Sequence, residues 1–215
     1  MYGYSVESRE VSFSAAAFWG NLFGTVLFAV AAGYLGAMNS ALLSPFAGIL
    51  WLVEFAMLFV MSFMRRRKSI SYATAYSFTG LSGLVTGVAI GANPVYMHVV
   101  GISALETIGL FAVLSVIAIA TGQVFLRMGT FLYAMLIALI IVDLISFFAF
   151  RTPADQVVLS SIGGLLFCGF VLYDIQRAYK KRYAETVPML VVNVYLDLLN
   201  LFMSILNLNA FFSKK

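Results

Sequence analysis

The sequence predicts an all-α integral membrane protein, built as a bundle of seven transmembrane helices. Hydrophobic residues make up 62% of the 215-residue chain and charged residues only 10%, whereas soluble domains are roughly 45–50% apolar and about 25% charged. The hydrophobic residues fall into seven long runs, each close to the ~20 residues that cross a bilayer. Only short polar, glycine or proline breaks separate the runs. These observations exclude a soluble globular protein and make the lipid bilayer the first partner of the chain.

The expected helices follow these runs in order, after a short polar lead at residues 1–12 that we expect in the cytoplasm. No break is long enough to hold a second domain, so we expect one transmembrane domain over residues 1–215. No basic lead-in precedes the first run, which favours a retained helix over a cleaved signal peptide. The runs lie at 15–36, 46–64, 70–91, 97–121, 129–150, 157–179 and 187–212.

The distribution of Lys and Arg predicts the orientation, because cytoplasmic loops of membrane proteins carry an excess of positive charge. The first, third and fifth loops hold only Arg151. We therefore expect the N-terminus in the cytoplasm and the C-terminus outside, and the short loops favour a bacterial plasma membrane. A re-entrant last segment would instead return the C-terminus to the cytoplasm, which Lys214 and Lys215 weakly favour. The second, fourth and sixth loops hold Arg65, Arg66, Arg67, Lys68, Arg127, Arg177, Lys180, Lys181 and Arg182.

Two single residues limit the chemistry. Cys168 is the only cysteine, so no internal disulfide can form, and His98 is the only histidine, so a histidine-based metal cluster is excluded. The net charge of +4 comes from the short basic loops and does not indicate nucleic-acid binding. We expect no permanently bound cofactor, no nucleic-acid partner and no enzymatic activity.

Small residues recur at helical spacing in two of the runs. Gly80, Gly83, Gly87 and Gly91 form a stripe on the third run, and Gly20 and Gly24 form a pair on the first. Because small residues let helix backbones approach closely in lipid, we expect both sets to lie in helix–helix contacts.

The last run carries a polar stripe. Asn193, Asp197, Asn200, Ser204 and Asn207 follow one another at spacings of 4, 3, 4 and 3, which place them on one face of a helix. Amides and carboxylates find no hydrogen-bond partner in lipid. The stripe is therefore expected to face other helices or a hydrated cavity.

Carboxyl groups also occur inside the hydrophobic runs, without Lys or Arg in the same runs to pair with them. Each costs roughly 2.5–3.5 kcal/mol at the bilayer centre by insertion scales unless it is paired or hydrated. Any one of them could join two helices as a neutral group, but together they are typical of a cation or proton pathway. Carboxylate oxygens, with the amide oxygens of Asn193 and Asn200, suit calcium. The carboxyl groups are those of Glu54, Glu106, Asp143, Asp174 and Asp197.

Asp174 and Asp197 are the strongest candidates for a functional pair. They flank the loop near Lys180, at depths that differ by about one helical turn at ~1.5 Å per residue. Two carboxylates that share a site cannot both ionise easily, so they titrate as a unit. Such a pair would form a pH sensor. Arg65, at the end of the second run, is the expected third member, with the alternative of a simple topological anchor. Glu54 lies on nearly the same helix face as Arg65.

Sequence motifs around these residues resemble a known family. Tyr173-Asp174, the basic loop, Pro188 and the stretch Tyr195–Phe202 are similar to the last two helices of the transmembrane Bax inhibitor motif family. Glu54 with the following Met64–Lys68 resembles its second helix and the start of the next loop. The seven-run plan extends the resemblance over the whole chain.

The resemblance implies a seven-helix bundle with six helices around a central seventh, and a pH-sensitive calcium leak with calcium as the permeant ion. The family's two sensor aspartates map onto Asp174 and Asp197, which are also the candidate calcium ligands. Its arginine latch maps onto Arg65. Protonation of the aspartates would weaken the latch and shift the population toward an open state.

Other functions fit parts of the sequence. A membrane adaptor that regulates a membrane protease or a cell-death pathway would need no carboxylate ladder, so a flux abolished by Asp174→Asn would argue against it. A proton-coupled transporter would show paired broken helices, which the sequence lacks. An intramembrane serine protease would need Ser82 within reach of His98, yet helical rise separates them in depth by roughly a dozen Å.

Overall fold

The computed structural model describes residues 14–66, 71–122, 124–148, 152–180 and 186–213, without the side chains of 62–66, 147, 148 and 153. Throughout these ranges the chain is helical where it is regular, and 7 helices are long and apolar enough to cross a membrane. The predicted all-α seven-helix bundle is confirmed. The long helices are α1 (Ala15–Met38), α3 (Ala47–Arg66), α4 (Tyr72–Gly91), α5 (Pro94–Ala120), α6 (Gly129–Phe148), α7 (Pro153–Tyr179) and α8 (Val187–Phe212). Short helices complete the connections: α2 (Ser40–Leu43), η1 (Ser44–Phe46) and η2 (Phe125–Met128).

Polar side chains fix the starts of several helices. Ser14 caps α1 by accepting a hydrogen bond from the backbone N–H of Ala17, and Ser71 caps α4 in the same way. At the start of α7, Thr152 and Asp155 form a reciprocal capping box. These caps satisfy backbone N–H groups that have no partner within the helix.

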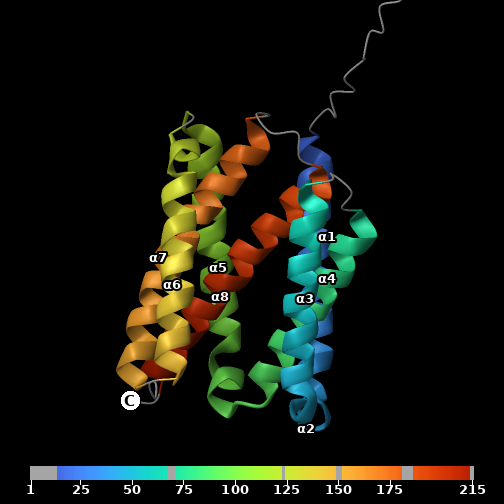
Figure 1. The fold of residues 1–215 in the computed structure, drawn as a ribbon, viewed down its shortest axis with the longest axis vertical. Helices are drawn as coiled ribbons and strands as arrows, with labels where there is room; N and C mark the ends of the chain where they lie inside the picture. Colours follow the sequence, from blue (N-terminus) through green and yellow to red (C-terminus); the bar gives the residue numbers. More distant parts are fainter. Residues whose placement is uncertain (1–13, 67–70, 123, 149–151, 181–185, 214–215) are drawn as a thin grey trace, which may run out of the picture.

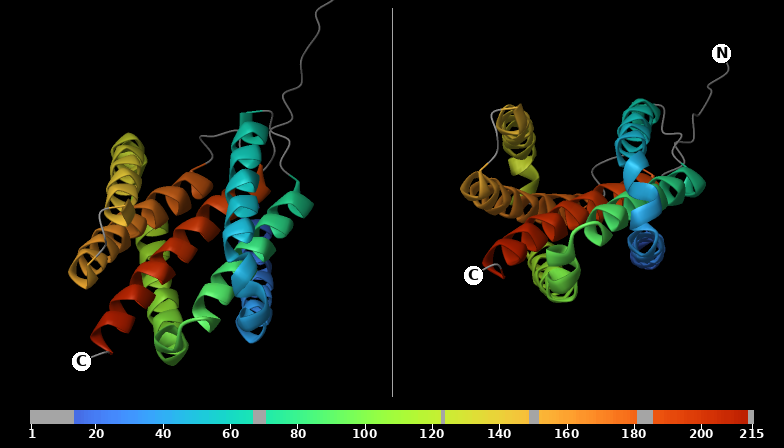
Figure 2. Two further views of the ribbon diagram at one scale, coloured as in Figure 1. Left: turned by 60° about the horizontal axis from the view of Figure 1, so that its bottom comes forward. Right: turned by 90° about the horizontal axis from the view of Figure 1, so that it is seen from below.

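The long helices form three layers, which Figure 2 shows from below. The middle layer contains α4, α8 and α7, with α8 between the other two. On one face lie α3 and α6, and on the other lie α1 and α5. Helix α8 packs against α1, α4, α5 and α7, so the last helix is central, as expected, within a layered bundle (Figure 1).

Burial follows the layers. About half of the residues of α4, α7 and α8 are buried, whereas in α3 Met61 is the only buried residue among those whose side chains the structure describes. The exposed side chains of α3 and α6 are large and apolar, for example Trp51, Phe55 and Ile137. Such a surface suits contact with lipid and leaves the polar residues to the middle layer.

The closest helix contact is between α1 and α4, and it depends on glycines. An added Cβ at Gly83 or Gly87 would meet the α1 backbone at Ala29 or Gly33. The predicted packing role of the α4 stripe is therefore confirmed. The predicted α1 pair is only half right: Gly24 faces the Tyr76 hydroxyl, but Gly20 has no atom within 4 Å of an added Cβ. Because α1 meets α4 farther along, this end of α1 does not need a second glycine.

Candidate functional site

Two buried carboxyl groups meet at the end of the bundle where α7 ends and α8 begins. Asp174 on α7 is 3% exposed and Asp197 on α8 is 6% exposed. Their side chains interact directly, within hydrogen-bonding range. Asp197 Oδ2 is buried and accepts no hydrogen bond from the residues that the structure describes. The two carboxyl groups are thus in contact, and Asp197 Oδ2 offers a position for a proton that the two groups share.

Arg177 is the described cation at this pair. Its Nη1 lies 3.3 Å from Asp174 Oδ1, and both side chains are 5% exposed. Its charge also acts on Asp197. The guanidinium lies 5.8 Å from the centre of the Tyr173 ring. The spacing Asp174-x-x-Arg177 is the sequence signal for this contact, because residues three apart share a helix face. Arg177 therefore belongs to the site and is more than the loop charge expected from the distribution of Lys and Arg.

The surroundings of the pair are apolar. Val171 and Ile175 on α7 and Val194 on α8 are fully buried in one hydrophobic cluster. Charge interactions are stronger in such surroundings than in water, because the effective dielectric constant is lower. The charges of the pair therefore act on each other more strongly than they would in water.

Arg65, the predicted latch, lies in the last turn of α3, but its side chain is outside the described part of the structure. Its role stays a prediction.

Gln176, next to the site, joins α7 to the connection between α5 and α6. Its Oε1 accepts hydrogen bonds from the backbone N–H groups of Phe125 (2.9 Å) and Leu126 (3.1 Å). Its Nε2 donates to the carbonyl oxygens of Ala118 (3.3 Å) and Gly122. This fully buried amide fixes the end of α5 and the start of η2 against α7. The sequence gives no signal for this contact, because the partners of Gln176 lie 50 or more positions away.

Glu54 belongs to a second polar cluster between α3, α4 and α8. Its half-buried carboxyl lies beside the hydroxyl of Ser82 and acts on that of Tyr195. Tyr195 donates to the carbonyl oxygen of Thr79 at 3.3 Å. Ser82 is fully buried, and its hydroxyl makes no hydrogen bond within the described residues. The structure therefore brings Glu54 to α8, but to a different part of it than Asp174 reaches.

The two remaining predicted acidic residues, Glu106 and Asp143, lie away from the Asp174–Asp197 pair. Glu106 is exposed on α5 and accepts a hydrogen bond from Asn209 Nδ2 at 2.7 Å. Asn209 also donates to the Ser103 hydroxyl at 3.1 Å. Asp143 is half-buried on α6, a helix that packs mainly against α7 and η2. The expected carboxylate ladder thus has members on α3, α5, α7 and α8, with Asp143 to one side.

The polar stripe of α8 faces the interior, as expected. Asn193 is half-buried with an Nδ2 that has no partner among the described residues. Asn200 is half-buried and donates to the carbonyl oxygen of Leu196 at 2.8 Å. Asn207 accepts from Tyr96 Oη at 2.7 Å and from Gln156 Nε2 at 3.3 Å, which joins α8 to α5 and α7.

Two other arrangements are not favoured. Ser82 is buried against Glu54 and Tyr195, whereas His98 is exposed on α5, so the serine–histidine contact of a protease is not formed. Among the described residues no group of three His, Cys, Asp or Glu side chains could hold a metal ion. The positive charge of Arg177 would oppose calcium binding by Asp174 and Asp197.

Helices of membrane-spanning length around a sequestered carboxyl pair define an integral membrane protein with charge held inside its bundle. The family model described as "Inhibitor of apoptosis-promoting Bax1" matches residues 16–214, and the chain belongs to this Bax inhibitor family.

Named relatives show the spread of the family. An uncharacterized protein of Helicobacter pylori is 29% identical over 89% of this chain and 84% of its own length. Bax inhibitor 1 of Schizosaccharomyces pombe is 34% identical over 64% of this chain and 51% of its own. The Golgi anti-apoptotic protein of Vaccinia virus is 33% identical over 55% of this chain and 50% of its own.

Proposed function

We propose that this protein is a pH-sensitive calcium leak across its membrane, gated by Asp174 and Asp197. The observation that carries the proposal is the direct contact of the two buried carboxyl groups from neighbouring helices. Two ionised carboxylates at contact repel each other, and one shared proton removes that repulsion. The pair is thus a two-helix element whose stability depends on proton concentration.

The charge balance sets the direction of gating. With one shared proton, the remaining negative charge is matched by Arg177 at 3.3 Å. Loss of that proton leaves a net negative site, which attracts a further cation; the proposed latch Arg65 would supply it and hold the closed state. A second proton removes the last negative charge of the pair, so no charge is left to hold the proposed latch Arg65, and α7 loosens from α8. Acidification therefore shifts the population toward the open state.

A permeant cation would pass oxygen atoms along α8. Glu54 with Tyr195 offers oxygens between α3 and α8, and the amide oxygens of Asn193 and Asn200 lie on the inward stripe. Glu106 lies beside Asn209 near the end of α8, and Asp143 extends the pathway only if it widens toward α6. Calcium favours such oxygen ligands, and single weak sites let an ion leave again.

The test is calcium flux into proteoliposomes between about pH 5 and about pH 8. We expect a leak that rises on acidification in the wild type, and a leak independent of pH in Asp174→Asn and Asp197→Asn, because neither variant can form the proton-sharing pair. Asp155→Asn is the matched control: it makes the same change on α7, but at the exposed capping box. An unchanged pH response in both pair variants would refute the sensor.

A second candidate is a regulator of cell death that transports nothing. The names of the relatives from fission yeast and Vaccinia virus concern inhibition of cell death, which favours such a role. It would be preferred if correctly inserted protein showed no calcium flux at any pH.

A further inference from the structure

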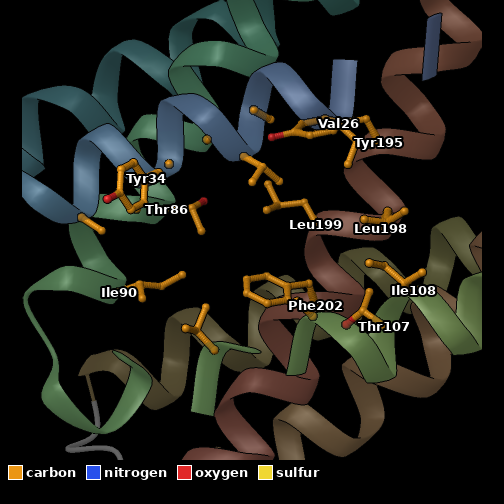
Figure 3. Close-up of a pocket in the computed structure, with 18 of the residues that line it drawn as sticks. Val26, Tyr34, Thr86, Ile90, Thr107, Ile108, Tyr195, Leu198, Leu199 and Phe202 are labelled. Carbon is orange, nitrogen blue, oxygen red and sulfur yellow. The ribbon is translucent and has the colours of Figure 1, made fainter. Parts of the chain in front are cut away.

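An apolar cavity of about 350 Å³ lies between α1 and α5, with α4 and α8 as its floor (Figure 3). Thr86 and Gly87 on α4 and Leu199 and Phe202 on α8 line the floor, and Val30 lines the α1 wall. The few lining hydroxyls include that of Thr107, which already donates to the carbonyl oxygen of Ser103. The cavity therefore offers an occupant almost no hydrogen bonds.

The two ends of the cavity differ. Beyond one end the side chains of α1 and α5 meet, with the rings of Trp19 and Phe111 6.3 Å apart. Tyr34 and Met97 line the cavity at the other end. These two side chains are 65% and 50% exposed, so this end opens on the surface of the bundle.

The opening faces the bilayer and not water. Each wall belongs to a helix of membrane-spanning length, and the exposed side chains beside the opening are apolar. Val26 and Ala37 on the α1 wall are separated by about three helical turns, roughly 16 Å at 1.5 Å per residue. That is about half of the ~30 Å hydrocarbon core. The cavity thus spans the depth of one leaflet, from the middle of the bundle to the end where α1 stops.

We propose that this cavity is a binding site for one acyl chain of a bilayer phospholipid from that leaflet. An empty cavity of this size is unfavourable because its walls lose their packing contacts, and water in it would lack polar partners. Acyl chains surround the opening in the membrane and match its apolar walls and its length. Bound lipid would fill the space between α1 and α5 without contacting Asp174 or Asp197, although Tyr195 of the proposed ion pathway also lines the cavity. The test below measures lipid binding and not calcium flux, so its outcome does not depend on the proposed leak.

The test uses phosphatidylglycerol with a photoactivatable diazirine in one acyl chain, in vesicles of phosphatidylethanolamine and phosphatidylglycerol. We expect cross-links to Thr86 and Leu199, on the cavity floor. Ala104→Phe should abolish them by filling the cavity from the α5 wall. Leu105→Phe is the matched control, because the adjacent Leu105 is 69% exposed and does not line the cavity. Cross-links confined to exposed residues such as Leu105, or unchanged by Ala104→Phe, would overturn the proposal.

A second measurement does not depend on the folding of Ala104→Phe. In a Cys168→Ser background, the thiol of Leu199→Cys should not react with a charged, water-soluble thiol reagent in vesicles. Rapid reaction would mean that water fills the cavity. Disulfide-linked dimers of this variant would mean that a second copy occupies it. Either result would refute an acyl-chain site.

Discussion

Replacing Arg177 by Gln tests the electrostatics of the carboxyl pair most directly. The Arg177 guanidinium lies 3.3 Å from Asp174 and also acts on Asp197. Removing this positive charge leaves the pair with an uncompensated negative charge whenever it holds one proton. Protons then bind the pair more tightly, so the protonated, leak-competent state persists to higher pH.

The distance sets the size of the effect. At 3.3 Å and an effective dielectric constant of ~20, two unit charges interact by about 5 kcal/mol. The observed effect will be smaller, because Gln still donates a hydrogen bond and removal of the guanidinium relieves its own desolvation. Carboxylates beside a single cation respond by roughly 1–3 pH units. We therefore expect the pH of half-maximal leak to rise by about 1–3 units in Arg177→Gln.

The assay is calcium flux as a function of pH in proteoliposomes, with Arg177→Lys as the charge-conserving control. Lys keeps the positive charge, so its profile should stay close to that of the wild type. A profile of Arg177→Gln that is unshifted, or shifted to lower pH, in protein that elutes as the wild type does on size exclusion, would show that Arg177 does not compensate the pair.

Two further predictions concern stability, measured as thermal unfolding in detergent. Gly87→Leu should destabilise the protein by about 1–3 kcal/mol, as overpacking does, because the new side chain meets the Gly33 backbone. Gly20→Leu is the control and should have little effect, because the space around Gly20 is open. Equal losses of stability in the two variants would contradict the assigned contact. Gln176→Ala should cost about 1–3 kcal/mol through two unsatisfied backbone N–H groups of η2, whereas Gln156→Ala, at a half-buried site with longer hydrogen bonds, should cost less.

The fold was predictable because hydropathy in a membrane protein reports helix position almost directly. Backbone groups in lipid must be satisfied within each segment, so a long apolar run has few alternatives to a helix. Hydropathy does not report which helices are neighbours. How side chains fit between helices decides the layers seen in Figure 2. It also decides that Gly33 and Gly36, and not Gly20, make the close contacts of α1.

The candidate site was predictable where partners are close in sequence. Asp174 and Asp197 flank one short loop, so their similar depth followed from helical rise alone. The cluster of Glu54, Ser82 and Tyr195 joins three helices, and no spacing rule relates residues on separate helices whose rotation is unknown. Each of these residues could be recognised singly as polar in an apolar run, but not as a neighbour of the others.

The ratio of charges at the site limits how the proposed sensor can work. One arginine is described at two carboxyl groups, so the state with one shared proton is the electrically balanced one. Adding or removing a proton unbalances the site in opposite directions. A sensor of this kind responds gradually. Because one proton is exchanged at each step, the ratio of open to closed protein changes about tenfold per pH unit. A leak that instead switched over a few tenths of a pH unit would require several coupled protons, and the other carboxyl groups of the bundle would then have to titrate with the pair.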